Sequence, residues 1–264
     1  MILIGERING MFKDIRKAIQ ARNSGSIEDW ARKQAEAGAH YLDISTGPTV
    51  PAEEQPEVLR WMVETAQGVV DLPCCLDSVN PDTIRAGLAV HRGKAIINST
   101  SADQECMDVL LPLAAEYQAA IIGLAMNEQG VPKDANDRLA LAMEIVANAD
   151  AHGLSTADLY IDPLVLPVNV AQEHVVEVLE TLRQVKLLAS PPPLTVVGLS
   201  NVSQRCPDRP LINRTFLVMA MACGLDAAIL DVNDEPLVDA AATAGILLNR
   251  EVYCDSYLKV FRKR

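Results

Sequence analysis

The chain lacks an uninterrupted run of about 18 apolar residues, the length from which a membrane-spanning helix is recognised. Its first residues also meet Glu6 and Arg7 too soon for the apolar core of a signal peptide. Basic residues are in the minority, since 23 Lys and Arg stand against 35 Asp and Glu for a formal net charge of −12. Binding to a phosphate backbone needs a concentrated basic footprint. We therefore expect a soluble, cytoplasmic protein that binds neither nucleic acid nor a membrane.

Motifs for metal binding are missing as well. The four histidines show no HxxxH or HxH spacing, and the six cysteines show no CxxC spacing. Three of the cysteines lie in apolar surroundings, where a free cysteine behaves as a small hydrophobic residue. We expect reduced thiols, no disulfide bond and no metal site.

What the sequence does contain is an alternation of short apolar runs and helical stretches along its whole length. The predicted strands are residues 2–4, 41–45, 74–77, 95–98, 120–124, 159–162, 195–199 and 227–230. The predicted helices are residues 26–37, 53–68, 81–91, 103–117, 136–151, 172–188, 212–223 and 236–248. Eight strand-helix units in 264 residues predict an α/β fold, a (β/α)8 TIM barrel in one domain over residues 1–264.

A doubly wound open sheet would give the same alternation of strands and helices. Such a sheet usually has five or six strands and carries a glycine-rich turn after the first strand. The sequence GERING at residues 5–10 does not match that turn, and the alternation continues for eight units. The barrel is therefore favoured.

Polar residues end three of the predicted strands, as Asp77 in LDS, Asn98 in INS and Asp162 before Pro163. In a barrel these strand ends converge on one face, where the active site forms. An unpaired buried carboxylate is costly, so Asp77 and Asp162 need a donor-rich partner such as a heterocycle with an amidine-like N–H edge. Each Asp alone could equally cap the next helix, and a lone Asn is more often a turn former. Their combination favours a ligand pocket, where Asn98 offers both a donor and an acceptor.

The segment GLSNVSQR, residues 198–205, is the most specific motif of the chain. Gly198 would let a ligand ring lie close to the backbone, and Asn201 and Gln204 place two amides on one loop or first helical turn. The loop at residues 125–135 is longer than most strand-to-helix connections, so we expect it to cover the site.

GERING, LDS, INS, DP and GLSNVSQR occur in the order and positions of the motifs of the pterin-binding barrels. Within that group the chain most closely resembles the methyltetrahydrofolate:corrinoid/iron-sulfur protein methyltransferases of the acetyl-CoA pathway, over essentially its whole length. The dihydropteroate synthases of the same group carry a pterin-contacting lysine in the strand-seven motif, and residues 201–204 contain none. The resemblance therefore favours methyl transfer over diphosphate displacement.

The resemblance implies an SN2 transfer of the N5-methyl group of methyltetrahydrofolate to the Co(I) corrinoid (a cobamide) of a partner corrinoid/iron-sulfur protein. It implies that Asn201 is the catalytic residue near N5. The pterin-binding residues that it implies are Asp77, Asn98, Asp162, Gly198, Ser200, Gln204 and Arg209. Because asparagine is a poor Brønsted acid, we expect Asn201 to stabilise the protonated N5 through a hydrogen bond. The resemblance also implies a homodimer, to which the apolar stretch 216–223 could contribute.

Two other functions fit the same motifs. One is a methylcorrinoid:tetrahydrofolate methyltransferase that works in the demethylation direction. The other is a module that holds a reduced folate, or docks a corrinoid protein, without catalysis. Asn201 and Gln204 argue weakly against the module, while the direction of transfer, the corrinoid partner and the proton source for N5 stay open.

Overall fold

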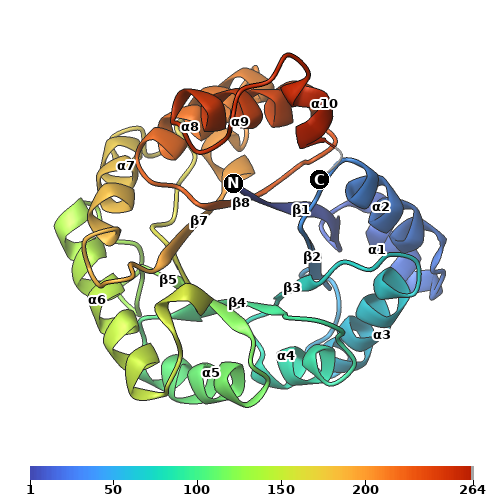
Figure 1. The fold of residues 1–264 in the computed structure, drawn as a ribbon. Helices are drawn as coiled ribbons and strands as arrows, with labels where there is room; N and C mark the ends of the chain where they lie inside the picture. Colours follow the sequence, from blue (N-terminus) through green and yellow to red (C-terminus); the bar gives the residue numbers. More distant parts are fainter. Residues whose placement is uncertain (263–264) are drawn as a thin grey trace.

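Eight parallel strands close into a barrel in the computed structural model, which describes residues 1–262. Each strand pairs with the next along the chain, and β8 pairs with β1 (Figure 1). The strands are β1 (Ile2–Asn9), β2 (Tyr41–Ser45), β3 (Cys74–Asp77), β4 (Ile96–Ser101), β5 (Ala120–Leu124), β6 (Leu159–Asp162), β7 (Leu194–Gly198) and β8 (Ala227–Leu230). The predicted (β/α)8 TIM barrel is confirmed.

Helices surround the barrel as an outer ring (Figure 1). They are α1 (Lys13–Ala21), α2 (Gly25–Glu36), α3 (Gln55–Gln67), α4 (Pro81–Leu88), α5 (Gln104–Glu116), α6 (Ala135–Ala151), α7 (His174–Val185), α8 (Arg209–Ala222), α9 (Glu235–Leu247) and α10 (Tyr257–Phe261), with the 3₁₀ turns η1 (Thr156–Asp158) and η2 (Leu199–Ser203). The eight predicted helices are present with ends within three residues of the prediction. Within residues 1–262, none of the helices is long and apolar enough to cross a bilayer.

Helices α1 and α10 were missed by the sequence prediction. In α1 the buried residues Ile15, Ala18 and Ile19 follow the i, i+3, i+4 spacing of an amphipathic helix. Only nine residues long, the helix lies between the GERING motif and the stronger pattern of α2. The helical periodicity of α1 was therefore present in the sequence, but it covered too few residues to predict a helix.

Strand β1 extends five residues beyond its predicted end, so GERIN is part of a strand and not a loop. Gly5 pairs with Leu42 and Ile8 with Ile44, so three steps along β1 match two along β2. This irregularity is a β-bulge, a feature that re-aims side chains at barrel rims. A Cβ on Gly5 would lie 2.3 Å from Oε1 of Gln34, which explains why glycine stands there. The bulge brings Glu6 to the mouth of the barrel.

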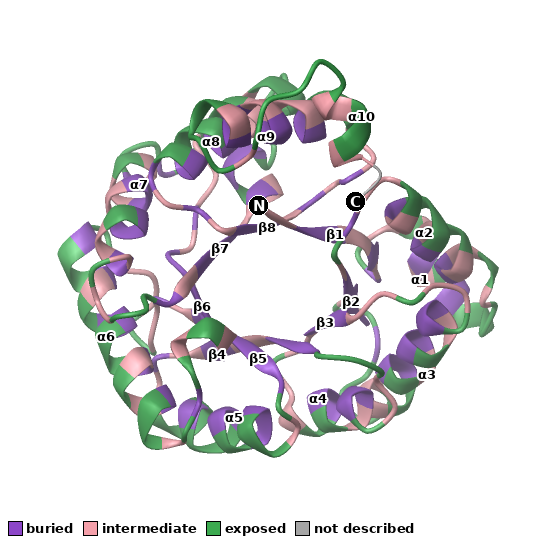
Figure 2. Ribbon diagram, viewed as in Figure 1, coloured by how far each residue is buried: buried purple, intermediate pink, exposed green. Residues whose placement is uncertain are grey.

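Buried side chains form two clusters separated by the sheet. The larger one fills the space between the strands and the inward faces of the helices, whose outward faces are exposed (Figure 2). The smaller one fills the barrel itself and consists of Ile4, Cys75, Ile96, Ala120, Ile122, Tyr160, Val196 and Ala227. The barrel interior is therefore a packed core and not a pore.

Above this apolar layer lies a mostly polar one. Side chains alternate along a strand, so the residue two positions after an interior residue also points inward, one layer closer to the mouth. The pairs related in this way are Ile4 and Glu6, Cys75 and Asp77, Ile96 and Asn98, Tyr160 and Asp162, Val196 and Gly198, and Ala227 and Ile229. On β2, Tyr41 packs against the interior cluster and is followed by Asp43. On β1, β2, β3, β4 and β6 one inward-facing step thus changes an apolar side chain into a polar one, whereas β7 and β8 continue with Gly198 and Ile229.

Candidate active site

A cavity of about 420 Å³ opens at the carboxyl ends of the strands. This volume lies within the range of roughly 300–1,000 Å³ that is typical of small-molecule sites. Of the residues that the sequence nominates, the cavity is lined by Asp77, Asn98, Gly198, Ser200, Asn201, Gln204 and Arg209. The strand ends therefore bring these residues together across more than 130 positions of sequence.

Asp162 is not among the residues that line this cavity, although it lies in the same layer. Its side chain is buried, and Oδ1 accepts a hydrogen bond of 2.7 Å from the backbone N–H of Leu164. Burial raises the pKa of Asp162 to about 7, although N–H donors of Leu164 and Gly198 and the charge of Arg138 act in the opposite direction. Asp162 thus braces the turn after β6 against β7, and its contact with a ligand stays a prediction.

Asp43 and Asp77 form a carboxyl pair on neighbouring strands. Burial raises the pKa of both, and the charge of Asp77 raises that of Asp43 further. The amide nitrogen of Asn98 donates to Oδ1 of Asp43 at 3.2 Å, which leaves the amide oxygen of Asn98 free to accept from a ligand. A hydrogen bond from Ser45 partly stabilises the charged form of Asp77. The pair retains a proton at pH values where a solvated Asp is ionised.

Asn201 projects from η2 beside Gly198. A Cβ on Gly198 would lie 2.9 Å from Nδ2 of Asn201, so the missing side chain makes room for that amide. The sequence interpretation assigned this space to a ligand ring, whereas the structure gives it to Asn201. Arg209 braces the same turn, because its guanidinium donates to the carbonyl of Ser200 at 3.2 Å and to Oγ of Ser203 at 3.1 Å.

Glu6, Asn9, Met11, Phe12, Asp43 and Ile229 also line the cavity and were not nominated from the sequence. For Glu6, Asp43 and Ile229 a usable signal existed, since each stands two positions after an inward-facing residue. Met11 and Phe12 follow the bulged end of β1 and could not be placed without its geometry. The hydroxyl of Ser200 donates to Oε2 of Glu6, which joins η2 to β1.

An aromatic stack holds the loop after β1. The guanidinium of Arg7 lies 3.7 Å from the ring centroid of Phe12 and 4.2 Å from that of Trp30. Asp14 pairs with Arg7 at 3.4 Å and accepts from the indole N–H of Trp30 at 2.6 Å. Cation–π contacts of this kind fix the ring of Phe12 as an apolar part of an otherwise polar wall.

The long loop at residues 125–135 does not cover the cavity, contrary to our expectation. Its residues line a separate cavity of about 360 Å³ against α6. The backbone N–H of Glu128 donates to Asp103 at 2.7 Å, and the carbonyl of Pro132 accepts from the buried Arg138 at 2.9 Å. These contacts hold the loop against α5 and α6, so the mouth is bordered by Met11 and Phe12 instead.

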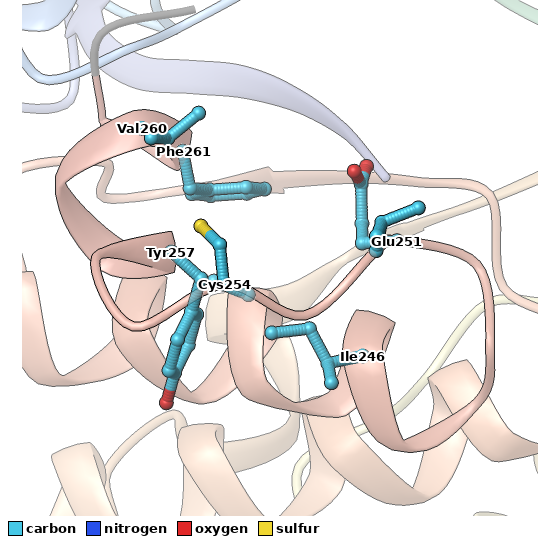
Figure 3. Close-up of a pocket in the computed structure, with 8 residues that line it drawn as sticks. Ile246, Glu251, Cys254, Tyr257, Val260 and Phe261 are labelled. Carbon is cyan, nitrogen blue, oxygen red and sulfur yellow. The ribbon is translucent and has the colours of Figure 1, made fainter.

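A much smaller cavity of about 60 Å³ lies between α9 and α10 (Figure 3). The sulfur of Cys254 points toward the ring of Phe261 there, with Ile246 and Tyr257 nearby. This space holds at most a few waters and cannot enclose a heterocycle. Across residues 1–262, no three His, Cys, Asp or Glu side chains are grouped so that they could hold a metal ion.

The family model of pterin-binding enzymes matches residues 9–231. The chain belongs to the pterin-binding enzyme family. The matched region runs from the bulged end of β1 to the residue after β8, and thus includes every strand end that borders the cavity.

Among curated proteins, the chain is 31% identical to the methylcorrinoid:tetrahydrofolate methyltransferase of Eubacterium limosum, over 100% of this chain and 97% of that protein. It is 28% identical to the methionine synthase of Mycobacterium tuberculosis over 87% of this chain, which corresponds to 20% of that longer protein. The solved structure of Yersinia pestis DHPS with a pterine-sulfa conjugate has a TM-score of 0.67 and 16% identity, and covers 94% of each chain. At that identity the structural likeness concerns the fold alone.

Proposed function

We propose that this chain transfers the N5-methyl group of methyltetrahydrofolate to the Co(I) corrinoid of a partner corrinoid/iron-sulfur protein. The observation that carries the proposal is the match to the Eubacterium limosum methyltransferase, which spans essentially both chains and supports methyl transfer between a folate and a corrinoid. The direction and the corrinoid/iron-sulfur partner rest on the resemblance of the sequence motifs. The cavity adds chemical support, because it combines a hydrogen-bonding wall with an amide on a tight turn.

In this proposal the pterin edge faces the side of the cavity formed by β3 and β4. Asp77 accepts from ring N–H groups, and Asn98 supplies the amide oxygen that Asp43 leaves free. We place Asp162, which lies in the same layer on β6, beside this wall. Gly198 and Ser200 line the ring through their backbone, and Gln204 and Arg209 border the mouth.

The difficult step is the departure of N5, because an amide-like pterin anion is a poor leaving group. Co(I) supplies the electron pair that forms the cobalt–carbon bond, while the pair of the breaking carbon–nitrogen bond stays on N5. Asn201 accepts a hydrogen bond from the protonated N5 through its amide oxygen and so stabilises that form. Gly198 allows the amide to take this place.

A second candidate is the reverse reaction, in which a methylcorrinoid methylates tetrahydrofolate. It is favoured by the name of the Eubacterium limosum relative, methylcorrinoid:tetrahydrofolate methyltransferase, in which the methylcorrinoid comes first. The same residues would serve both directions, because a transition state is shared by the forward and reverse reactions. The non-catalytic folate module is the third reading, and the cavity alone fits it equally well.

A homodimer is also part of the proposal. Of the stretch 216–223, the outward apolar residues are Val218 and Met219, with 38% and 45% exposure, and the small Ala222. Phe216, Leu217, Ala220 and Met221 are buried within the subunit. The stretch could therefore contribute only a narrow apolar surface to a dimer.

The test is a titration of the purified protein with methyltetrahydrofolate, followed by addition of Co(I) cobalamin. Formation of methyl-Co(III), followed by absorbance, would establish methyl transfer, and the reverse assay with methylcobalamin and tetrahydrofolate would compare the two directions. If the protein binds methyltetrahydrofolate but transfers its methyl group neither to free cobalamin nor to a corrinoid/iron-sulfur protein, the non-catalytic module would be favoured. Absence of folate binding would overturn the pterin site.

A further inference from the structure

Glu6 is a carboxyl group in the cavity wall that has no role in the function proposed so far. It follows the interior residue Ile4 by two positions, within the bulge of β1, and its side chain therefore points into the mouth. The methyl transfer proposed above needs a proton at N5, and Asn201 cannot supply one as a free acid.

Glu6 lies on the same side of the cavity as Asn201. The hydroxyl of Ser200 donates to Oε2 of Glu6, and Ser200 is the residue directly before Asn201 on η2. Arg209 holds the carbonyl of Ser200 at 3.2 Å, so the turn that carries both residues is fixed. One short chain of contacts therefore joins the carboxyl group to the amide assigned to N5.

Charged groups from several elements face Glu6. Burial raises the pKa of Glu6 above its ordinary value, and the negative charge of Asp231 after β8 raises it further. Arg209 on α8, Arg7 on β1 and the Ser200 hydrogen bond favour the charged form but do not outweigh burial. On β2, Asp43 is a further carboxyl neighbour. A carboxyl that keeps its proton to higher pH than a solvated glutamate is suited to general acid catalysis.

The other carboxyl groups of this layer are engaged differently. Asp43 accepts from the amide of Asn98, and Asp77 pairs with Asp43 on the side given to the pterin edge. Asp162 accepts from two backbone N–H groups and does not line the cavity. Glu6 is the carboxyl that borders η2.

We propose that Glu6 is the acid that protonates N5 of the folate as the methyl group leaves, and that Ser200 is the positioning residue that holds its carboxyl group. This inference rests on the proposed methyl transfer. As the carbon–nitrogen bond breaks, its electron pair stays on N5 and takes the proton from Glu6. The methyl group bonds to Co(I) through the electron pair of cobalt, and the Glu6 carboxylate then regains a proton from solvent. In the reverse direction the carboxylate accepts the N5 proton.

The decisive variant is Glu6→Gln, which keeps an acceptor oxygen for Ser200 but has no acidic proton. We expect single-turnover methyl transfer to Co(I) cobalamin to slow by about 100-fold or more, within the usual contribution of general acid catalysis. Methyltetrahydrofolate affinity should stay within about threefold, because the proton is required only as the bond breaks. The pH dependence of the rate should lose the limb that wild type shows as Glu6 ionises. Glu6→Asp keeps an acid and should transfer faster than Glu6→Gln, whereas the exposed control Glu105→Gln should match wild type.

A second measurement does not depend on turnover. Infrared difference spectra of wild type against Glu6→Gln, recorded from pH 5 to 9, should contain the C=O stretch of a protonated carboxyl that disappears with the same midpoint as the rate limb. A Glu6 that is ionised wherever wild type transfers at its maximal rate would overturn the role. An unchanged rate and pH profile in Glu6→Gln, with wild type active, would overturn this inference alone. A wild-type protein that binds folate but transfers no methyl group in either direction would overturn the proposed function and this role with it.

Discussion

The interior of the barrel and its mouth lie one inward-facing residue apart on each strand, yet they contain opposite kinds of side chain. The interior cluster holds only Ile, Val, Ala, Cys and one Tyr, at 4% exposure or less. The layer at the mouth holds Glu6, Asp43, Asp77 and Asp162, together with the amide of Asn98, and all of these except Asp162 line the cavity. Apolar burial stabilises the fold, whereas buried ionisable groups work against it.

All four carboxyl groups have a raised pKa. Burial is the largest cause that raises the pKa of each one, so the folded protein disfavours their charged forms. A barrel can close without such groups, because apolar side chains fill the layer below. Ionisable groups with a shifted pKa gather at functional sites, because catalysis and binding need pKa values that differ from those in water. The difference between the layers therefore separates stability from function, and it can be tested layer by layer.

The largest effect on stability is expected from the interior. Ile96 is fully buried on β4 among the interior side chains. Ile96→Ala should lower the free energy of unfolding by about 2–5 kcal/mol, because it removes buried methyl groups and leaves a cavity. Urea unfolding followed by circular dichroism measures this. The control is Val109→Ala, since Val109 is 48% exposed on α5 and should change stability by about 0.5 kcal/mol or less. Equal stability of the two variants would contradict the assignment of the interior layer.

The next effect is expected at the mouth and concerns rate. Asn201→Ala should slow methyl transfer by about 10- to 1,000-fold, as for loss of one preorganised hydrogen-bonding group in the transition state. Its stability should stay close to that of wild type, because Asn201 is exposed. Single-turnover absorbance with Co(I) cobalamin gives the rate. Gln204→Ala, which removes the other amide of the motif, should instead weaken folate binding. Unchanged turnover in Asn201→Ala would remove this residue from the mechanism.

The fold could be predicted from the sequence because each strand is a short apolar run between helical patterns. Strands β2, β3, β5, β6 and β8 have the predicted bounds. The extensions of β1 and β4 could not be predicted, because in each strand the pairing shifts at a bulge within polar residues. When only hydrophobicity is considered, polar strand residues at a barrel rim are predicted to form a loop.

The candidate site could be predicted in part. Asp77, Asn98 and the residues of GLSNVSQR stand at strand ends, so their convergence followed from the barrel. Glu6 and Asp43 were missed because they lie inside strands, although the alternation of side chains from Ile4 and Tyr41 points to both. Which carboxyl groups keep a proton depends on burial and on their neighbours in space, and the sequence contains neither.

A smaller effect is expected at Gly198, where the reason for glycine is space and not backbone conformation. The Cβ of Gly198→Ala would lie 2.9 Å from Nδ2 of Asn201, so the amide must move. Because that atom ends a mobile side chain, the fold should tolerate the change, and methyl transfer should fall by about tenfold through misplacement of a group at N5. The double variant with Asn201→Ala should be no slower than Asn201→Ala alone. Additive losses in the double variant would show that Gly198 acts independently of Asn201.

The smallest expected effect is a dependence of the free energy of unfolding on pH that is due to Asp162. Its pKa is raised from the ordinary value of 3.8 to about 7, so the unfolded chain releases this proton at lower pH than the folded one. The contribution of Asp162 to stability therefore falls as the pH rises from about 4 to about 7 and is constant above that, with a slope of at most about 1.4 kcal/mol per pH unit. In Asp162→Asn the amide oxygen can still accept from Leu164, but this slope should be lost.

The measurement is urea unfolding at pH 5, 6, 7 and 8. Plots of the free energy of unfolding against pH for wild type and Asp162→Asn should converge or cross below pH 7 and run parallel above it. The exposed control Asp71→Asn should follow wild type at every pH. Parallel curves over the whole range would mean that the carboxyl of Asp162 is solvated, and the contrast between the two layers would not extend to β6.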